Sequence, residues 1–253
     1  DTDGCVIACS DDERVRKVLD GCGRRVVWFG LTGSPDVFAA DVDVAKPNPT
    51  YTLVRRGGAL GTVELRVPGV QNVVDSLAAA AAAFELGVGF DDIRDGLREF
   101  HGAGRRFELL YDDGRTMVVD DYAHHPAELQ ATIQAARTGY GKRVVAVFQP
   151  HLYSRTKIFT NEFAQALSQA DEVIVTSIYA AREQPMEGVT AECIVNRMKS
   201  DGFASARYVA DKDTLPKELS ERIRPSDMVM VIGAGDIRKV GEELASILRG
   251  VHK

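Results

Sequence analysis

The chain has 253 residues, of which 45% are hydrophobic and 27% are charged, and its formal net charge is −6. This composition is typical of a soluble globular protein with one large domain or two smaller ones. No stretch approaches the roughly 18 apolar residues that a membrane-spanning helix needs, and the acidic balance argues weakly against nonspecific nucleic-acid binding. We therefore expect a cytoplasmic protein whose partners are neither membranes nor nucleic acids.

The four cysteines, Cys5, Cys9, Cys22 and Cys193, fit neither a zinc ribbon nor a CxxC redox pair. We expect them to be reduced. The chain begins with Asp1 rather than Met, so we expect its true N-terminus to lie upstream.

Within the first hundred residues, strand and helix patterns alternate at first, and a segment that favours antiparallel strands comes next. A capping box at Ser10 and Glu13 predicts the start of the first helix. Between residues 37 and 67 the apolar positions have no helical period, and glycines separate short alternating runs, which indicates strands and turns. The expected elements are strands at 6–8, 25–29, 51–55 and 62–67, and helices that end near Leu19, run from Asn72 to Gly87, and carry Ile93, Leu97 and Phe100.

From Thr116 onward, strand and helix patterns alternate strictly, which predicts a doubly wound parallel sheet of the α/β class. We place a domain boundary near residue 108. The expected strands are 117–119, 144–148, 172–178, a weak one near Tyr208, and 228–232, and the expected helices are 126–137, 156–168, 191–199, 215–222 and 237–248.

Two loops follow buried strands in this second half, DDYAHHP at 120–126 and QPHLYSRTK at 149–157. If the two strands are parallel neighbours, both loops leave the same edge of the sheet, where ligands bind in open α/β folds. A carboxylate at such a strand end can accept hydrogen bonds from ribose hydroxyls. Because adjacent strand residues point to opposite sides, Asp121 is favoured over Asp120 for that contact. The alternative for both is a turn or capping aspartate.

The other polar side chains of these loops divide between ligand contact and structure. Because a proline follows it, His125 is expected at a helix cap, whereas His124 lies beside Tyr122 and is a candidate to hydrogen-bond an anionic substrate. Arg155 suits a bidentate pair with a carboxylate or phosphate, against the alternative of a solvated charge. His151 is evenly balanced between packing and ligand contact. The spacing of the histidines does not support zinc, and we expect no metal ligand in this chain.

Two further candidates lie outside these loops. GAGDI at 233–237 lacks the third glycine of a dinucleotide fingerprint, so a structural turn with Asp236 capping the next helix is favoured. Arg105 and Arg106 lie at the expected domain boundary, where a guanidinium can clamp a phosphate; the alternative is a solvated pair in a linker. No GxxxxGK[ST] phosphate loop occurs in the sequence.

Seven segments, taken in order, resemble the Mur ligases of peptidoglycan synthesis: CSDDERV, VPGVQN, GAGRRFE, DDYAHHP, VFQPHLYSRT, YAAREQP and GAGDI. The resemblance covers nearly the whole chain. It implies a C-terminal Rossmann-like doubly wound sheet at 108–253, preceded at 1–107 by the back of a central α/β ATPase domain. By the same resemblance, the UDP-binding domain, the phosphate loop and the magnesium ligands are expected upstream of Asp1.

The resemblance also implies a function. Such a protein is expected to be an ATP- and Mg²⁺-dependent ligase that adds L-alanine to UDP-N-acetylmuramate through an acyl phosphate, with this chain alone inactive. By motif match, the expected ATP contacts are Asn72, Arg106 and Asp121. The expected substrate contacts are Tyr122, His124 and Arg155, with Arg106 and His124 as the catalytic residues.

Three positions depart from the family pattern, and two other functions stay open. Gln71 stands where the family usually has histidine, and Asp75 where it has a second asparagine. Leu152 replaces a frequent arginine, so recognition of the alanine carboxylate is expected to rest more on Arg155. The alternatives are a recycling ligase that adds a preformed tripeptide, which matches QPHLYSRT poorly, and a noncatalytic binding module with the ligase fold.

Overall fold

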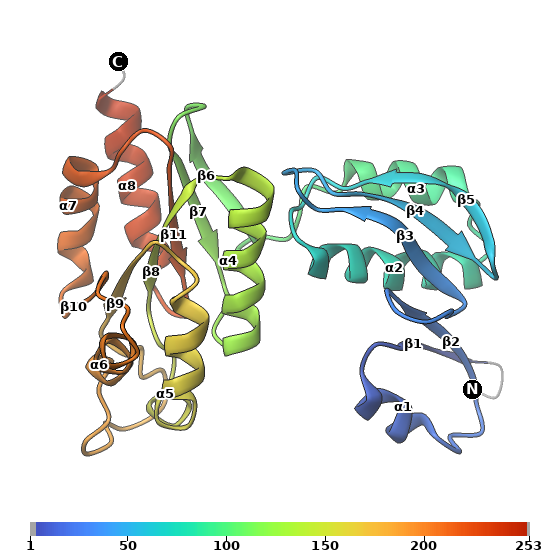
Figure 1. The fold of residues 1–253 in the computed structure, drawn as a ribbon, viewed down its shortest axis with the longest axis horizontal. Coiled ribbons are helices and arrows are strands. Elements are labelled where there is room, and N and C mark those ends of the chain that lie inside the picture. The colour runs from blue at the N-terminus through green and yellow to red at the C-terminus, as the bar shows by residue number, and fades with distance from the viewer. Residues whose placement is uncertain (1–3, 252–253) are drawn as a thin grey trace. The chain divides into compact units, whose positions relative to one another are not determined.

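The computed structural model describes residues 4–251, which form two compact units. The first unit runs to His101 and includes residues 138–140, and the second comprises 102–137 and the chain from Gly141 onward. Each unit contains a mixed sheet with helices (Figure 1), so the predicted α/β class is confirmed. Within the described range, no helix is both long enough and apolar enough to cross a membrane.

The first unit is a five-stranded sheet in the order β1-β2-β3-β4-β5. Strands β1, β2 and β3 are parallel, whereas β3, β4 and β5 pair antiparallel. The predicted change from alternating to antiparallel structure is therefore confirmed. The elements of this unit are β1 (Cys5–Cys9), α1 (Glu13–Leu19), β2 (Arg25–Gly30), β3 (Val37–Asp43), β4 (Thr50–Arg55), β5 (Gly58–Glu64), α2 (Val70–Glu85) and α3 (Phe90–Glu99).

The start of α1 differs from the predicted capping box. Asp12, not Ser10, is the N-cap, and its carboxylate accepts a hydrogen bond from the backbone N–H of Arg14 at 2.8 Å. A carboxylate is favoured over a serine hydroxyl at this position because its negative charge also interacts favourably with the helix dipole. The apolar face predicted for α2 is confirmed, since its buried residues include Val73, Leu77, Ala81 and Phe84.

The second unit is a six-stranded sheet in the order β10-β9-β8-β11-β7-β6. All its pairings are parallel except that of β6 with β7. Its elements are β6 (Glu108–Asp112), β7 (Met117–Asp121), α4 (Pro126–Tyr140), β8 (Arg143–Phe148), α5 (Tyr153–Leu167), β9 (Glu172–Thr176), α6 (Glu192–Ser200), β10 (Ala206–Val209), the 3₁₀ turn η1 (Lys212–Thr214), α7 (Leu215–Arg222), β11 (Asp227–Ile232) and α8 (Arg238–Val251).

The strand order corrects one premise of the sequence prediction. The last strand, β11, lies between β7 and β8, so the strands ahead of the two candidate loops are not neighbours. Both pair in parallel with β11, and the loops therefore still leave the same edge of the sheet. The antiparallel strand β6 was not predicted. Periodicity indicates the type of an element, but it does not give the strand order.

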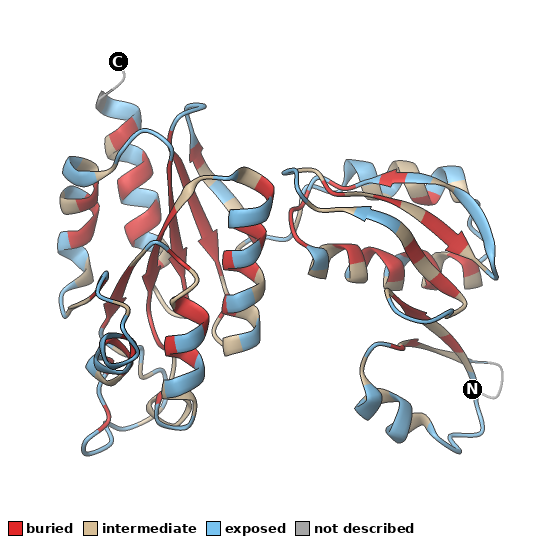
Figure 2. Ribbon diagram, in the orientation of Figure 1, coloured by how far each residue is buried: buried red, intermediate tan, exposed pale blue. Residues whose placement is uncertain are grey.

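Helices cover both faces of this second sheet (Figure 1). On one face, Val240 and Leu244 of α8 share a buried cluster with Val118 and Val231 of the sheet. Helices α4, α5 and α6 lie on the other face, as right-handed crossovers that all run in one direction require. There the ring of Phe163 on α5 lies 5.3 Å from that of Phe148 on β8. The central strands are buried over nearly their whole length (Figure 2), which fixes the loops at their ends.

Candidate functional site

The candidate residues of the second unit gather at the carboxyl ends of its parallel strands. The chain steps from β7 across to β8, β9 and β10 and then returns to insert β11. The strand order therefore reverses next to the two loops. Such reversal points form the ligand-binding crevices of open α/β sheets.

A row of aromatic rings joins three of the loops. The ring centroids of Tyr122 and His124 are 5.3 Å apart, and those of His124 and His151 are 6.0 Å apart. His151 then stacks on Tyr179 at 5.7 Å. Arg155 joins the row, because its Nη1 lies 3.3 Å from Nδ1 of His151. The structure thus brings the loops after β7, β8 and β9 together.

Glu128, which the sequence analysis did not single out, holds the first loop. His125 is the N-cap of α4, as predicted. The carboxylate of Glu128 accepts the backbone N–H of His124 at 2.9 Å and that of His125 at 3.1 Å. Burial alone would raise the pKa of Glu128, but these bonds bring it below its ordinary value. Nδ1 of His124 lies 2.9 Å from the carbonyl oxygen of Tyr122, which orients its ring.

The electrostatics around His125 and His151 favour the neutral imidazole. Burial first, and then the charge of Arg155, lowers the pKa of both His125 and His151. A neutral imidazole keeps a lone pair that can accept a proton or a hydrogen bond. Arg155 itself is half-buried on the first turn of α5.

The start of α5 is held by the loop that follows β9. Leu152 is the N-cap and has a left-handed backbone with φ of +72°. Its N–H donates to the carbonyl oxygen of Tyr179 at 3.0 Å. Glu183 accepts both the backbone N–H of Ser154, at 3.0 Å, and its hydroxyl. Glu183, which belongs to the YAARE segment, therefore fixes the turn that carries Arg155.

The carboxylate of Asp121 already has three donors from the protein. It accepts the backbone N–H groups of Ala123 at 2.8 Å and Phe107 at 2.9 Å, and the hydroxyl of Thr132 at 2.9 Å. Burial raises its pKa. A carboxylate can accept about four hydrogen bonds, so Asp121 has little capacity left to accept one from a ligand. Contact with a ribose stays a prediction.

Arg105 and Arg106 have different surroundings. Arg105 is half-buried, and its Nε lies 3.1 Å from Oδ2 of the fully buried Asp120. The alternative of a solvated linker pair is therefore wrong for Arg105. Arg106 is exposed, with its guanidinium carbon 5.8 Å from the centre of the Tyr122 ring. The predicted contact of Arg106 with a phosphate stays a prediction.

Asn72 lies in the first unit, on the first turn of α2. Its Nδ2 donates to the carbonyl oxygen of Pro68 at 2.7 Å. Two of the three departures from the family pattern, Gln71 and Asp75, lie on the same helix. An adenine contact by Asn72 stays a prediction.

The GAGDI turn after β11 is built into the same edge. A side chain at Gly233, where φ is +149°, would meet the carbonyl oxygen of Gln149 at 2.7 Å. The carboxylate of Asp236 accepts Nε2 of Gln149 at 2.9 Å and pairs with Lys212 at 3.2 Å. The sequence predicted that Asp236 would cap the next helix. Among the described residues, its carboxylate instead binds Gln149 and Lys212. Gln149, Tyr179 and Lys212 also line a pocket beside the turn.

Among residues 4–251, no group of three or more His, Cys, Asp or Glu side chains is arranged to hold a metal ion. At the row of rings, the side chains that this edge offers to a ligand include the guanidinium group of Arg155 and the imidazoles of His124 and His151.

The family profile "Mur ligase, glutamate ligase domain" matches residues 105–235, just over half of the sequence. This chain belongs to the Mur ligase family. The matched range includes Arg105 and Arg106, both candidate loops and the start of the GAGDI turn. The family resemblance noted from the sequence is therefore confirmed.

Two curated relatives carry the same name. The UDP-N-acetylmuramate–L-alanine ligase of Salinibacter ruber is 44% identical over 246 residues, which is 97% of this chain and 52% of that protein. The enzyme of the same name from Trichlorobacter lovleyi is 39% identical, over 97% of this chain and 54% of its own. The chain thus spans about half the length of the curated relatives that it matches.

Solved structures confirm the fold. The UDP-N-acetylmuramate–alanine ligase of Thermotoga maritima has a TM-score of 0.79 at 27% identity, covering 98% of this chain and 52% of that one. A murein peptide ligase from Psychrobacter arcticus has a TM-score of 0.68 at 21% identity, covering 98% and 52%. At that lower identity the likeness shows the fold alone.

Proposed function

We propose that the protein to which this chain belongs is an ATP-dependent ligase that joins L-alanine to UDP-N-acetylmuramate. The observation that carries the proposal is the convergence of Tyr122, His124, His151 and Arg155 at one sheet edge. Relatives that bear the name of this ligase align over nearly the whole chain. Residues 1–107 are assigned to the back of the central ATPase domain and 108–253 to the C-terminal domain.

The proposed reaction has two steps. A carboxylate oxygen of the muramate attacks the γ-phosphorus of ATP, which releases ADP and forms an acyl phosphate. The amine of L-alanine then attacks the acyl carbon, and the amide forms as inorganic phosphate leaves and the amine loses its proton. Both steps need cationic groups near the transferring phosphoryl group. The exposed guanidinium of Arg106 is assigned to that task.

The remaining site residues are assigned to the amino acid and the acyl group. Arg155 is assigned to the carboxylate of L-alanine because its planar guanidinium can bind both oxygens. Tyr122 and His124 are assigned to the acyl group, which places His124 beside the reacting carbon. Asn72 and Asp121 are assigned to adenosine. Magnesium would neutralise phosphate charge when bound, and its ligands are assigned to the family's central-domain segment upstream of Asp1.

ADP release tests the substrate assignment. In the full-length protein, L-alanine with UDP-N-acetylmuramate should give rapid ADP release, and a preformed tripeptide should give little. Strong preference for the tripeptide would replace the assignment with that of the recycling ligase. Absence of turnover with either substrate would favour the noncatalytic module.

The chain of 253 residues is itself proposed to be inactive, because it contains no phosphate-loop lysine. Magnesium-dependent ATP turnover by the purified chain would contradict this. A preparation of the full-length protein, assayed in parallel, serves as the positive control.

A further inference from the structure

Arg106 is flanked by two residues whose positions are set by adjacent carboxylates of β7. Asp120 and Asp121 point to opposite faces of the strand, as neighbouring strand residues do. Asp120 binds the side chain of Arg105, and Asp121 binds the backbone N–H of Phe107 at 2.9 Å. Arg106, between them, is exposed.

The contact with Asp120 belongs to a partly buried ionic cluster in which Asp120 is the buried member. Asp120 is 0% exposed, and its Oδ2 lies 3.1 Å from Nε of Arg105 and 2.9 Å from Nη1 of Arg238. Arg238 also binds Glu108 at 2.6 Å, and Glu108 accepts the backbone N–H of Arg105 at 2.7 Å. Two guanidinium groups and two carboxylates thus fix both the side chain and the backbone of Arg105.

Arg105 also reaches the turn after β11. Its Nη2 donates to the carbonyl oxygen of Gly233 at 2.7 Å and its Nη1 to that of Gly235 at 3.3 Å. In return, the carbonyl oxygen of Arg105 accepts the backbone N–H of Tyr122 at 2.7 Å. Arg105 therefore links its own segment, residues 105–107, to the first candidate loop and to the GAGDI turn.

The backbone of this segment is strained. Arg105 has φ of +60° and Phe107 has φ of +49°, and neither is a glycine. Such left-handed conformations persist only where surrounding contacts over-determine them, and they cluster at functional sites. In this conformation Arg105 binds Asp120 while Arg106 stays exposed, and their guanidinium carbons lie 4.8 Å and 5.8 Å from the centre of the Tyr122 ring.

We propose that Arg105, bound to Asp120, is a positioning residue that presents Arg106 to the phosphoryl group. The inference rests on the proposed ligase function. Arg105 does not touch the substrate in this assignment. Its guanidinium is used on Asp120, on two carbonyl oxygens and over the ring of Tyr122, whose centre lies 4.8 Å from the guanidinium carbon. The effect proposed for Arg105 on phosphoryl transfer passes through the neighbouring Arg106.

A double-mutant cycle in the full-length protein tests this coupling. Arg105→Lys keeps the charge but cannot span Asp120 and both carbonyl oxygens, so kcat should fall by about tenfold with little change in the KM for L-alanine. In an Arg106→Ala background the same change should lower kcat by less than about twofold, because the residue through which it acts is gone. Equal losses in both backgrounds would overturn the proposal.

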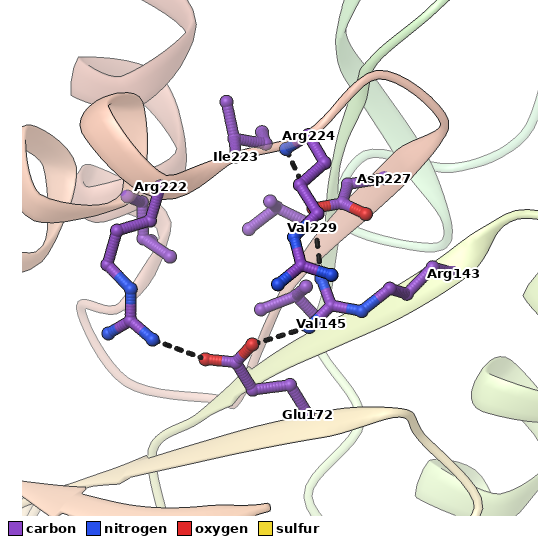
Figure 3. Close-up of a pocket in the computed structure, with 9 residues that line it drawn as sticks. Arg143, Val145, Glu172, Arg222, Ile223, Arg224, Asp227 and Val229 are labelled. Atoms are coloured by element: carbon purple, nitrogen blue, oxygen red, sulfur yellow. Dashed lines mark hydrogen bonds and ion pairs between the residues drawn. The ribbon is translucent and has the colours of Figure 1, made fainter.

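Arg143→Lys is a matched control, because Arg143 is the first residue of β8 and lies at the opposite end of the same sheet. Figure 3 shows the ion pairs that Arg143 forms there. Arg143 also bridges two carboxylates, Glu172 at 2.6 Å and Asp227 at 3.0 Å, and is about as exposed as Arg105, at 29% against 24%. Its replacement should leave kcat unchanged. If it lowers kcat as much as Arg105→Lys does, the effect is general destabilisation and the proposal fails.

Amide exchange on the present chain separates this inference from the proposed function. Arg105→Lys should raise the exchange rate of the Phe107 N–H by about tenfold and leave the amides of β8 unchanged. If Arg105→Lys does not fold, the nearly isosteric Asp120→Asn replaces it in both tests. A full-length wild type without ligase activity would remove the proposed function, and the positioning role would then be judged on exchange alone. An unchanged Phe107 amide would remove the positioning role.

Discussion

Replacing Asp121 by alanine removes the acceptor for three buried donors, the N–H groups of Phe107 and Ala123 and the hydroxyl of Thr132. Each buried donor that loses its partner costs about 1–3 kcal/mol. The substitution also removes a buried carboxylate whose raised pKa reflects unfavourable desolvation, which offsets part of the loss. We therefore expect the lower end of the sum, a loss of about 3–4 kcal/mol in the free energy of unfolding.

Urea unfolding of the present chain measures this loss. With an m-value of about 2 kcal/mol/M, the midpoint of the second unit should fall by about 1.5–2 M. Far-UV circular dichroism follows both units, whereas the single tryptophan, Trp28, lies in β2 and reports the first unit. Asp121→Asn keeps one acceptor oxygen and should lose about half as much. A loss below about 1 kcal/mol for Asp121→Ala would refute the view that this carboxylate holds the loops.

Three further outcomes are expected. Arg106→Ala in the full-length protein should lower kcat by about a hundredfold and change the KM for ATP much less; unchanged turnover in steady-state assays would contradict its role. The guanidinium of Arg238 lowers the pKa of Glu108 from 4.5 to about 2, so this carboxylate stabilises the fold above about pH 4.5 and the contribution is lost as pH falls toward 2. The urea midpoint of Glu108→Gln should therefore lie below that of the wild type near neutral pH and approach it on acidification, whereas a pH-independent gap would oppose this. Phe163→Ala, at a fully buried ring, should cost about 3–5 kcal/mol in urea unfolding, whereas Ile158→Ala on the exposed side of the same helix should change stability by less than about 0.5 kcal/mol.

The types and places of the elements could be predicted where the periodicity is strong. The strands at β8 and β11 are continuous apolar runs, and α7 was placed with its observed bounds, Leu215–Arg222. The position of β11 between β7 and β8 could not be predicted, because strand order depends on contacts between segments far apart in the chain. The strand β6 was missed because its sequence, ELLYD, is short and has an irregular register against β7.

For the site, the sequence indicated the loops but not the groups that hold them. Glu128, Glu183 and Gln149 each bond to a loop residue, and the partners of Glu183 and Gln149 lie 29 and 87 positions away. No local pattern gives such pairings. The sequence alternation did place Asp120 and Asp121 on opposite sides of β7, but it did not indicate that both carboxylates bind residues of the segment 105–107.

The division of charge at this edge explains how an acidic chain can present a site for anions. The carboxylates of Asp121, Glu128 and Glu183 accept backbone N–H groups, so their charge is used within the protein. Within residues 4–251, no ion pair engages Arg106 or Arg155, so their positive charge remains available. The formal net charge of −6 is therefore a poor guide to this edge. Because these carboxylates orient the loops and the guanidinium groups of Arg106 and Arg155 form no ion pair within the described residues, the edge should attract phosphate and carboxylate groups. That attraction should weaken as ionic strength rises.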